Sequence, residues 1–132
     1  MRALLLLPLL AACAATPPAC PAGTSPATTL EAFFGRNSGG REVVDDAAWA
    51  RFMDEVVTPA FPDGLTVLDG AGQWRNREGR IGRERSKVLV VAMPGATPAE
   101  AVARVAPVRR AYTARFAQES VMIATLDGCI GF

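Results

Sequence analysis

The order in which strand-like and helix-like segments follow one another is the feature that most restricts how this chain can fold. Apolar residues at strand spacing predict strands at residues 28–34, 65–75, 80–91 and 120–126. Helical spacing predicts one helix after the first strand and another before the last. This strand–helix–strand–strand–helix–strand order is typical of the ferredoxin-like fold, βαββαβ, an α+β architecture. We therefore expect a four-stranded antiparallel sheet of order 4-1-3-2, with two helices on one face.

The first helix has a clear expected start and end. Asp45 or Asp46 can cap it, and Trp49 and Phe52 then follow at helical spacing. We expect it to stop before Pro59, because the residue that precedes a proline avoids the α region.

The second helix begins with the strongest local signal in the chain. Thr97 and Glu100 form a capping box around a proline at the first helical position. Pro107 lies inside the helical run and predicts a kink or a short break, because its ring removes a hydrogen bond. The expected buried face consists of Val102, Val105, Val108, Tyr112 and Phe116.

The beginning of the chain has the pattern of an export signal. One arginine and about eight apolar residues match a signal peptide and are too few to span a bilayer. Leu10 to Cys13 resemble the bacterial lipobox, which implies a lipid on Cys13 and a protein anchored to the periplasmic side of a membrane. The alternative is that Ala12-Cys13-Ala14 forms an ordinary A-x-A cleavage site, which releases a soluble secreted or periplasmic protein. We expect a signal peptide at 1–12, a tether at 13–27 and one domain at 28–132.

The two remaining cysteines are expected to form a disulfide. With Cys13 assigned to processing, Cys20 and Cys129 are left in an oxidising compartment, where such a pair usually becomes oxidised. In the expected sheet the start of the first strand lies beside the end of the fourth, so both cysteines come to the same corner.

Charge and composition exclude several classes of function. The net charge is +1 and the chain has no histidine. A nearly neutral domain lacks the positive field that nucleic acid binding needs, so we expect no nucleic acid partner. Without histidine, zinc, haem and His-dependent catalysis lose their usual ligands and bases. We expect no metal and no cofactor.

Three segments carry a resemblance to a known family. They are Phe33-Phe34-Gly35-Arg36, residues 56–75 (VVTPAFPDGLTVLDGAGQWR) and residues 83–91 (RERSKVLVV). Through them the chain resembles domain-of-unknown-function family 3574, small exported bacterial proteins, many of them lipoproteins. The resemblance covers about residues 20–132. It implies a shared fold and a location in the cell envelope, and it implies no activity.

The hairpin between the second and third strands holds most of the candidate binding residues. Tryptophan and arginine are the residue types that anchor interfaces and anionic ligands. Pairing across the turn at 76–79 is expected to set Trp74 near Ile81 and Gly72 near Arg83. The alternative is a solvated hairpin in which Trp74 packs on Ile81 and the charges pair across strands. The candidates are Gln73, Trp74 and Arg75 on one strand, and Arg83, Glu84 and Ser86 on the other.

Outside the hairpin, Arg36 is the remaining binding candidate. With the glycine-rich loop that follows it, Arg36 can cradle an anion through its side chain and backbone N–H groups. The alternative is a plain connection between elements. No catalytic residue is assigned: Ser86 and Lys87 are consecutive, and consecutive strand residues point to opposite faces.

These observations favour one function and leave two others open. We expect an envelope lipoprotein that is a non-catalytic binding or interaction module, whose partner is an envelope protein or a small anionic ligand. The alternative is a small ferredoxin-like enzyme that acts as a dimer, joined through the sheet, on a small apolar or anionic substrate. A structural envelope protein without a discrete site is the third hypothesis.

Overall fold

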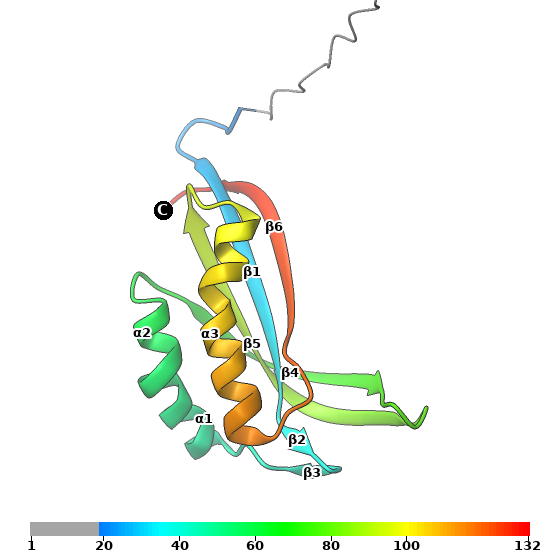
Figure 1. Ribbon diagram of the computed structural model, residues 1–132. Helices are drawn as coiled ribbons and strands as arrows, with labels where there is room; N and C mark the ends of the chain where they lie inside the picture. Colours follow the sequence, from blue (N-terminus) through cyan, green and yellow to red (C-terminus); the bar gives the residue numbers. More distant parts are fainter. Residues whose placement is uncertain (1–18) are drawn as a thin grey trace, which may run out of the picture.

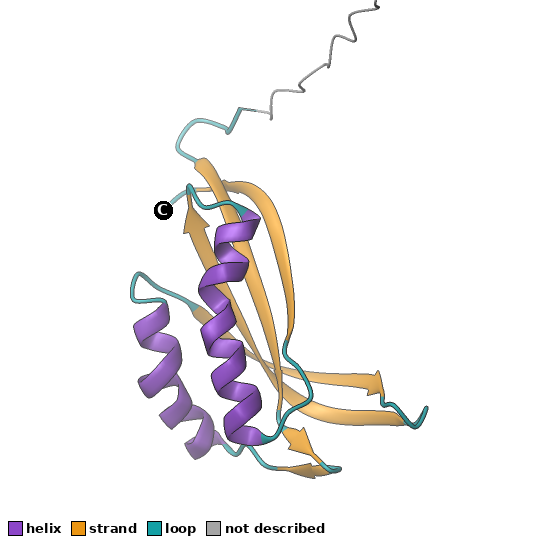
Figure 2. Ribbon diagram, in the orientation of Figure 1, coloured by secondary structure: helices purple, strands orange, loops and turns teal. Residues whose placement is uncertain are grey.

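Two helical stretches, residues 46–60 and 98–116, lie against one face of an antiparallel sheet (Figures 1 and 2). The computed structural model describes residues 19–132, so the expected signal peptide and Cys13 lie outside the described residues. The long strands are β1 (Ser25–Gly35), β4 (Thr66–Arg75), β5 (Ile81–Pro94) and β6 (Met122–Ile130). The helical segments are α1 (Asp46–Phe52), the π-helical η1 (Met53–Val57), α2 (Thr58–Ala60) and α3 (Pro98–Phe116).

The strands of the main sheet lie in the order β4-β5-β1-β6, and all neighbours are antiparallel. These strand numbers differ from the predicted 4-1-3-2, because the chain contains a short β-hairpin that we did not predict and its two strands are numbered as well. The hairpin pairs β2 (Asn37–Ser38) with β3 (Arg41–Glu42), and Gly39 and Gly40 turn it with φ of 58° and 78°. Counted without it, the long strands lie in the order second, third, first, fourth.

The core lies between the sheet and the helices. Leu30, Ala32 and Phe34 alternate along β1 and are fully buried, and Leu89 of β5 lies opposite Ala32 on the same face. An aromatic cluster fills the space behind them, with ring centroids 4.8–6.3 Å apart. Such pairs add about 0.5–1.5 kcal/mol each to the burial of their apolar area. The cluster consists of Phe34, Trp49, Phe52, Tyr112 and Phe116.

The first helix extends further than its sequence predicts. Asp45 is its N-cap and accepts a hydrogen bond from the backbone of Ala48, at 2.7 Å. The expected stop before Pro59 is wrong, because the helix continues through α2. The reason is η1, where the N–H of Thr58 reaches the carbonyl of Met53 five residues back. This wider turn accommodates a proline that has no N–H to donate.

In α3 the capping box of Thr97 and Glu100 is confirmed, with both hydrogen bonds present. The break predicted at Pro107 is wrong, since α3 runs unbroken past it. One lost hydrogen bond is offset by packing, because Val105 and Val108 on either side are buried in the core. Val102 was expected on the buried face but is 39% exposed, and Ala101 is buried there instead.

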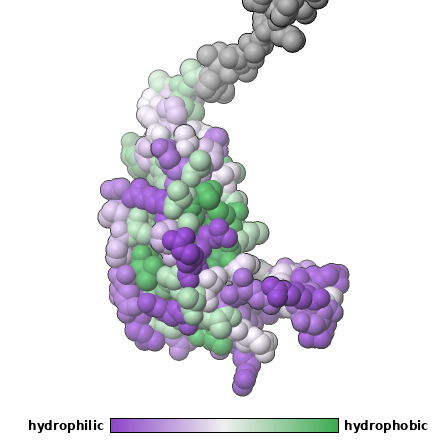
Figure 3. All heavy atoms as spheres, viewed as in Figure 1, coloured by the Kyte–Doolittle hydropathy of each residue, from purple (hydrophilic) through white to green (hydrophobic). Residues whose placement is uncertain are grey.

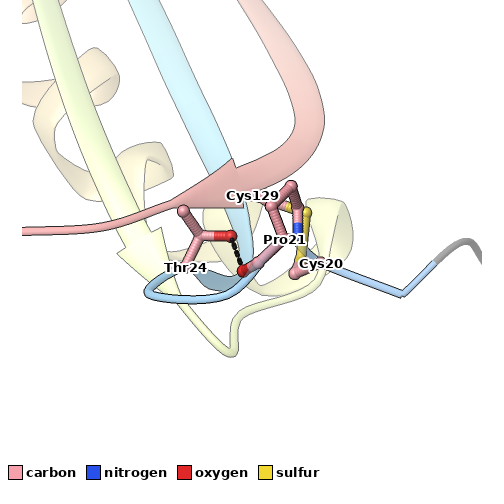
Figure 4. Close-up of a disulfide and its surroundings, with 4 residues drawn as sticks. All are labelled: Cys20, Pro21, Thr24 and Cys129. Atoms are coloured by element: carbon pink, nitrogen blue, oxygen red, sulfur yellow. Dashed lines mark hydrogen bonds between the residues drawn. A yellow bond between two sulfur atoms is a disulfide. The ribbon is translucent and has the colours of Figure 1, made fainter.

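A disulfide joins Cys20 to Cys129 at the corner where the start of β1 and the end of β6 lie side by side (Figure 4). Their Cα atoms are 5.6 Å apart, and Pro26 of β1 pairs with Cys129 of β6. Strand β1 begins at Ser25, three residues before the expected start of the domain. The bond therefore links the segment before β1 to the end of β6.

Candidate functional site

Strands β4 and β5 run beyond the rest of the sheet as a two-stranded projection. We call residues 70–85 the arm. In Figure 1 it points away from the helices at the end of the domain remote from the disulfide, and Figure 3 shows it as a hydrophilic projection. A lone hairpin buries little apolar surface, so its side chains are largely exposed to solvent.

The cross-strand register of the arm differs by one residue from the predicted one. Trp74 lies opposite Gly82 rather than Ile81, and Gly72 lies opposite Glu84 rather than Arg83. The turn sets this register, because Asn76 accepts from the N–H of Arg80 through its side chain and donates its own N–H to the Arg80 carbonyl.

The register decides what Trp74 contacts. A Cβ at Gly82 would be 3.5 Å from the indole nitrogen of Trp74, so the ring lies against the bare backbone of Gly82. Trp74 is 44% exposed and Ile81 is 46% exposed. Trp74 pairs with Gly82, and Ile81 is the residue next to Gly82, so the two side chains lie on opposite faces of the hairpin and the alternative packing of Trp74 on Ile81 is not formed.

A hollow of about 510 Å³ lies on the arm and is open to solvent. It brings together Gln73, Arg83 and Glu84 from the predicted set. Arg85 also lines it and was not predicted as a site residue, although its position two residues after Arg83 was a usable signal, since such residues share a face. The complete lining is Ala71, Gly72, Gln73, Arg83, Glu84 and Arg85.

The other predicted site residues do not line this hollow. Arg75 donates a hydrogen bond to the carbonyl of Gly79 and closes the turn. Ser86 lies over Gly70, where a Cβ would be 2.7 Å from the serine oxygen. Trp74 lies over Gly82, as described above. These three side chains have structural contacts within the hairpin.

The charges around the hollow are unequally compensated. Within residues 19–132 no carboxylate lies within 4.0 Å of the Arg83 guanidinium. Arg85 is only loosely paired, at 3.6 Å from both Glu42 and Asp46. The carboxylate of Glu84 is already occupied, because it accepts the backbone N–H of Asn37 at 3.0 Å. The hollow therefore presents positive charge.

Glu84 also explains a small residue on the neighbouring strand. A Cβ at Gly35 would lie 2.7 Å from a carboxylate oxygen of Glu84. Glycine at this position lets the carboxylate fold over β1 to reach Asn37. The sequence predicted Glu84 as a binding residue, and the structure shows that it ties the arm to the end of β1.

Arg36 is fully buried and is held by groups of its own chain. Its Nε donates to the carbonyl of Val44 at 2.6 Å, and its two terminal nitrogens lie 3.0 Å from Glu42 and 2.9 Å from Asp46. The contact to Asp46 is an ion pair without hydrogen-bond geometry. The guanidinium of Arg36 holds the pKa of Asp46 below its ordinary value. Arg36 does not line the hollow, so its predicted role in cradling an anion is replaced by a structural one.

Two further polar side chains are buried beside Arg36. The Nζ of Lys87 lies 2.6 Å from Asp69 and 3.6 Å from Asp46. Tyr112 donates to the carbonyl of Gly35 at 2.7 Å, and burial raises the pKa of its hydroxyl well above the ordinary value. With Arg36, they join the end of β1, the start of α1 and the base of the arm.

In residues 19–132 no group of three or more His, Cys, Asp and Glu side chains is placed to hold a metal ion. None of the described helices combines the length and apolar character required to cross a membrane.

Residues 29–132 match the sequence model of a family described as protein of unknown function (DUF3574). The chain belongs to this family. No curated protein matches this DUF3574 sequence.

Solved structures resemble the DUF3574 chain in fold. A phage SAM lyase in complex with S-methyl-5'-thioadenosine has a TM-score of 0.62 at 14% identity, covering 87% of this chain and 95% of its own. The apo state of a phage SAM lyase has a TM-score of 0.57 at 15% identity, covering 83% and 91%. A PII-like protein from Thiomonas intermedia K12 has a TM-score of 0.46 at 15% identity, covering 83% and 97%. At these identities the first two establish a shared fold.

Proposed function

We propose that this DUF3574 domain is a ferredoxin-like, non-catalytic binding module of the bacterial envelope that holds an anionic group on its arm. The observation that carries the proposal is the guanidinium of Arg83, which faces the hollow and has no carboxylate partner within residues 19–132. Guanidinium groups bind carboxylate and phosphate through two parallel hydrogen bonds.

The neighbours of Arg83 support binding of an anion. Gln73 is its direct cross-strand partner, so an amide lies beside the guanidinium. Arg85 lies on the same face and is paired at only 3.6 Å, which leaves donors for a ligand. An anion that enters here meets two cations and an amide without displacing a strong ion pair.

The same residues argue for binding rather than catalysis. Arginine and glutamine cannot act as bases near neutral pH. Glu84, the carboxylate in the lining, is engaged by the backbone of Asn37. The hollow is open to solvent and does not exclude water from a bound group. We therefore propose the enzyme hypothesis only as the second candidate.

Binding of inorganic phosphate or citrate, followed by NMR titration, tests the site. We expect Arg83→Ala to weaken binding by roughly tenfold or more, because a hydrogen bond to a charged group contributes about 1.5–3 kcal/mol. Arg51→Ala, an exposed arginine in the last turn of α1, is the matched control and should bind as the parent does. Equal binding by both variants, or no saturable shift in the parent, would contradict the proposal.

We further propose that the protein is anchored by a lipid on Cys13. The leader pattern supports this, and so does the disulfide, because disulfides persist mainly outside the cytoplasm. Cells fed a labelled fatty acid should yield a labelled parent protein in the membrane fraction. The Cys13→Ser variant should lose the label. An unlabelled parent protein that is freely soluble would exclude the anchor.

A further inference from the structure

The face of the sheet opposite the helices carries an apolar row that crosses every strand. Phe33 of β1 lies opposite both Val88 of β5 and Met122 of β6, and Val88 lies opposite Leu68 of β4. Met122 is 60% exposed and Leu68 is 52% exposed. Leu126, on the same face, is 52% exposed. We call this surface the open face.

An open face of this composition is unusual for a sheet in contact with water. The solvated face of an antiparallel sheet normally carries polar side chains, which alternate with the buried ones. Here the apolar side chains are contiguous from one edge strand to the other, and contiguous exposed apolar surface marks an interaction site. Burial of the open face against another surface therefore stabilises the protein.

One charged side chain lies within the open face. Glu31 is half-buried, and its cross-strand neighbours are Val90 and Ala124, both apolar. It has no ion pair within residues 19–132. A carboxylate among apolar neighbours favours a cation from whatever covers the face.

The arm has the complementary composition. Its segment 73–83 contains four arginines and one glutamate, together with Trp74 and Ile81, which are about half exposed. Among the ion pairs and hydrogen bonds of residues 19–132, the one that joins its turn to the rest of the domain is a long ion pair, Arg77 to Glu119 at 3.8 Å, between two exposed side chains. A two-stranded hairpin without such support is marginally stable in water. The arm therefore also gains from a partner.

We propose that two copies of this chain pack with their open faces together, and that the arm of each copy lies across the open face of the other. Each chain supplies both complementary surfaces: cations and an exposed indole on the arm, and a carboxylate within an apolar row on the face. The arm continues its own sheet, so it cannot fold onto its own open face and must reach the face of a second copy. Trp74 is on the same side of β4 as Leu68, because both follow the same alternation, so the apolar surface of the face extends onto the arm. Arg77 and Arg80, at the turn of the arm, do not line the hollow, so substitutions there test this inference separately from the anion site.

Sedimentation equilibrium of the full chain is expected to give twice the monomer mass. Met122→Glu places a charge in the apolar row and should shift the protein to the monomer mass. Val102→Glu is the matched control, since Val102 is an exposed apolar residue on α3. It should leave the mass unchanged. A monomeric parent at every concentration tested would overturn the proposal, and so would a dimer that survives Met122→Glu.

A charge exchange tests whether the arm is the part that covers the face. Glu31→Arg sets like charges against the arm, and Arg77→Glu with Arg80→Glu sets like charges against Glu31. Each variant alone should sediment as a monomer with an unchanged circular dichroism spectrum. Mixed together, they should form a dimer that contains one copy of each, because both arm-to-face contacts are then oppositely charged. Two monomeric variants that fail to associate, or variants that stay dimeric alone, would overturn the arm arrangement.

Discussion

Replacing Cys20 and Cys129 together by serine is expected to lower the free energy of unfolding by about 3–4 kcal/mol. The bond joins residues 109 positions apart, so it restricts almost the entire unfolded domain. A small domain has a total stability of only about 5–15 kcal/mol, so a loss of this size is readily measured. Equilibrium unfolding in urea, followed by circular dichroism, gives the difference directly.

The parent protein with a reductant is the control for the serine variant. Both lack the covalent bond, so their midpoints should agree, and both should lie well below that of the oxidised parent. Unfolding curves of oxidised parent and serine variant that coincide would contradict the expectation. The serine variant should also exchange amide hydrogens faster at Ala27 than at Leu30, because Ala27 pairs beside the missing bond and Leu30 lies deeper in the sheet.

The double variant Glu42→Gln with Asp46→Asn is expected to have a free energy of unfolding roughly 3 kcal/mol lower than that of the parent protein. It leaves the buried guanidinium of Arg36 without a negative partner, and removal of the partners of a buried charge typically costs about 3–5 kcal/mol. The lower end applies because Asp46 is largely exposed, so solvent screens part of the interaction. Each single variant should lose less than half of the total, because the other carboxylate still faces the arginine.

A third substitution separates the charge from the geometry. Adding Arg36→Met to the double variant removes the uncompensated cation and should recover part of the lost stability. If the triple variant is no more stable than the double variant, the loss came from packing or caps and not from the buried charge. Thermal unfolding of the three proteins under the same conditions is sufficient.

The same network predicts a pH dependence. The pKa of Asp46 is lower in the folded state than in the unfolded chain, because Arg36 favours the carboxylate. Its contribution is therefore complete above the unfolded pKa of about 3.9 and is lost as the pH falls through the folded pKa. The parent should lose Tm below about pH 4 more steeply than the double variant. Parallel Tm profiles would contradict this assignment.

These contacts give Arg36 a role that differs from binding. The backbone N–H of Arg36 donates to the carbonyl of Arg85. The two carboxylates that face the Arg36 guanidinium, Glu42 and Asp46, also lie near the Arg85 guanidinium. Arg36 thereby holds the base of the arm against β1 and α1. The proposed anion site lies next to this rigid base, which limits how much Arg83 and Arg85 must reorganise when a ligand binds.

Local signals were sufficient for several elements. The helix cap expected at Asp45 or Asp46, which is Asp45, the box of Thr97 and Glu100, and the alternation along β1 depend on residues that are close in sequence, and the structure contains all of them. The pairing of Cys20 with Cys129 followed from the assignment of Cys13 to processing and from the strand order, which brings the start of the first strand and the end of the last to one corner.

Other features depended on contacts between distant segments. From the sequence, Arg36 is expected to be a cation in a loop. Its burial depends on β3 and α1, which supply its partners Glu42 and Asp46. The register of the arm changed with the hydrogen bonds of one turn, which moved the partner of Trp74 by a residue. Local periodicity is a property of the chain, so the sequence alone determined the order of the long strands and of the two helical segments. Burial and pairing are properties of the neighbours, so only the tertiary structure decided which charges lie free on the arm and which sheet face stays uncovered.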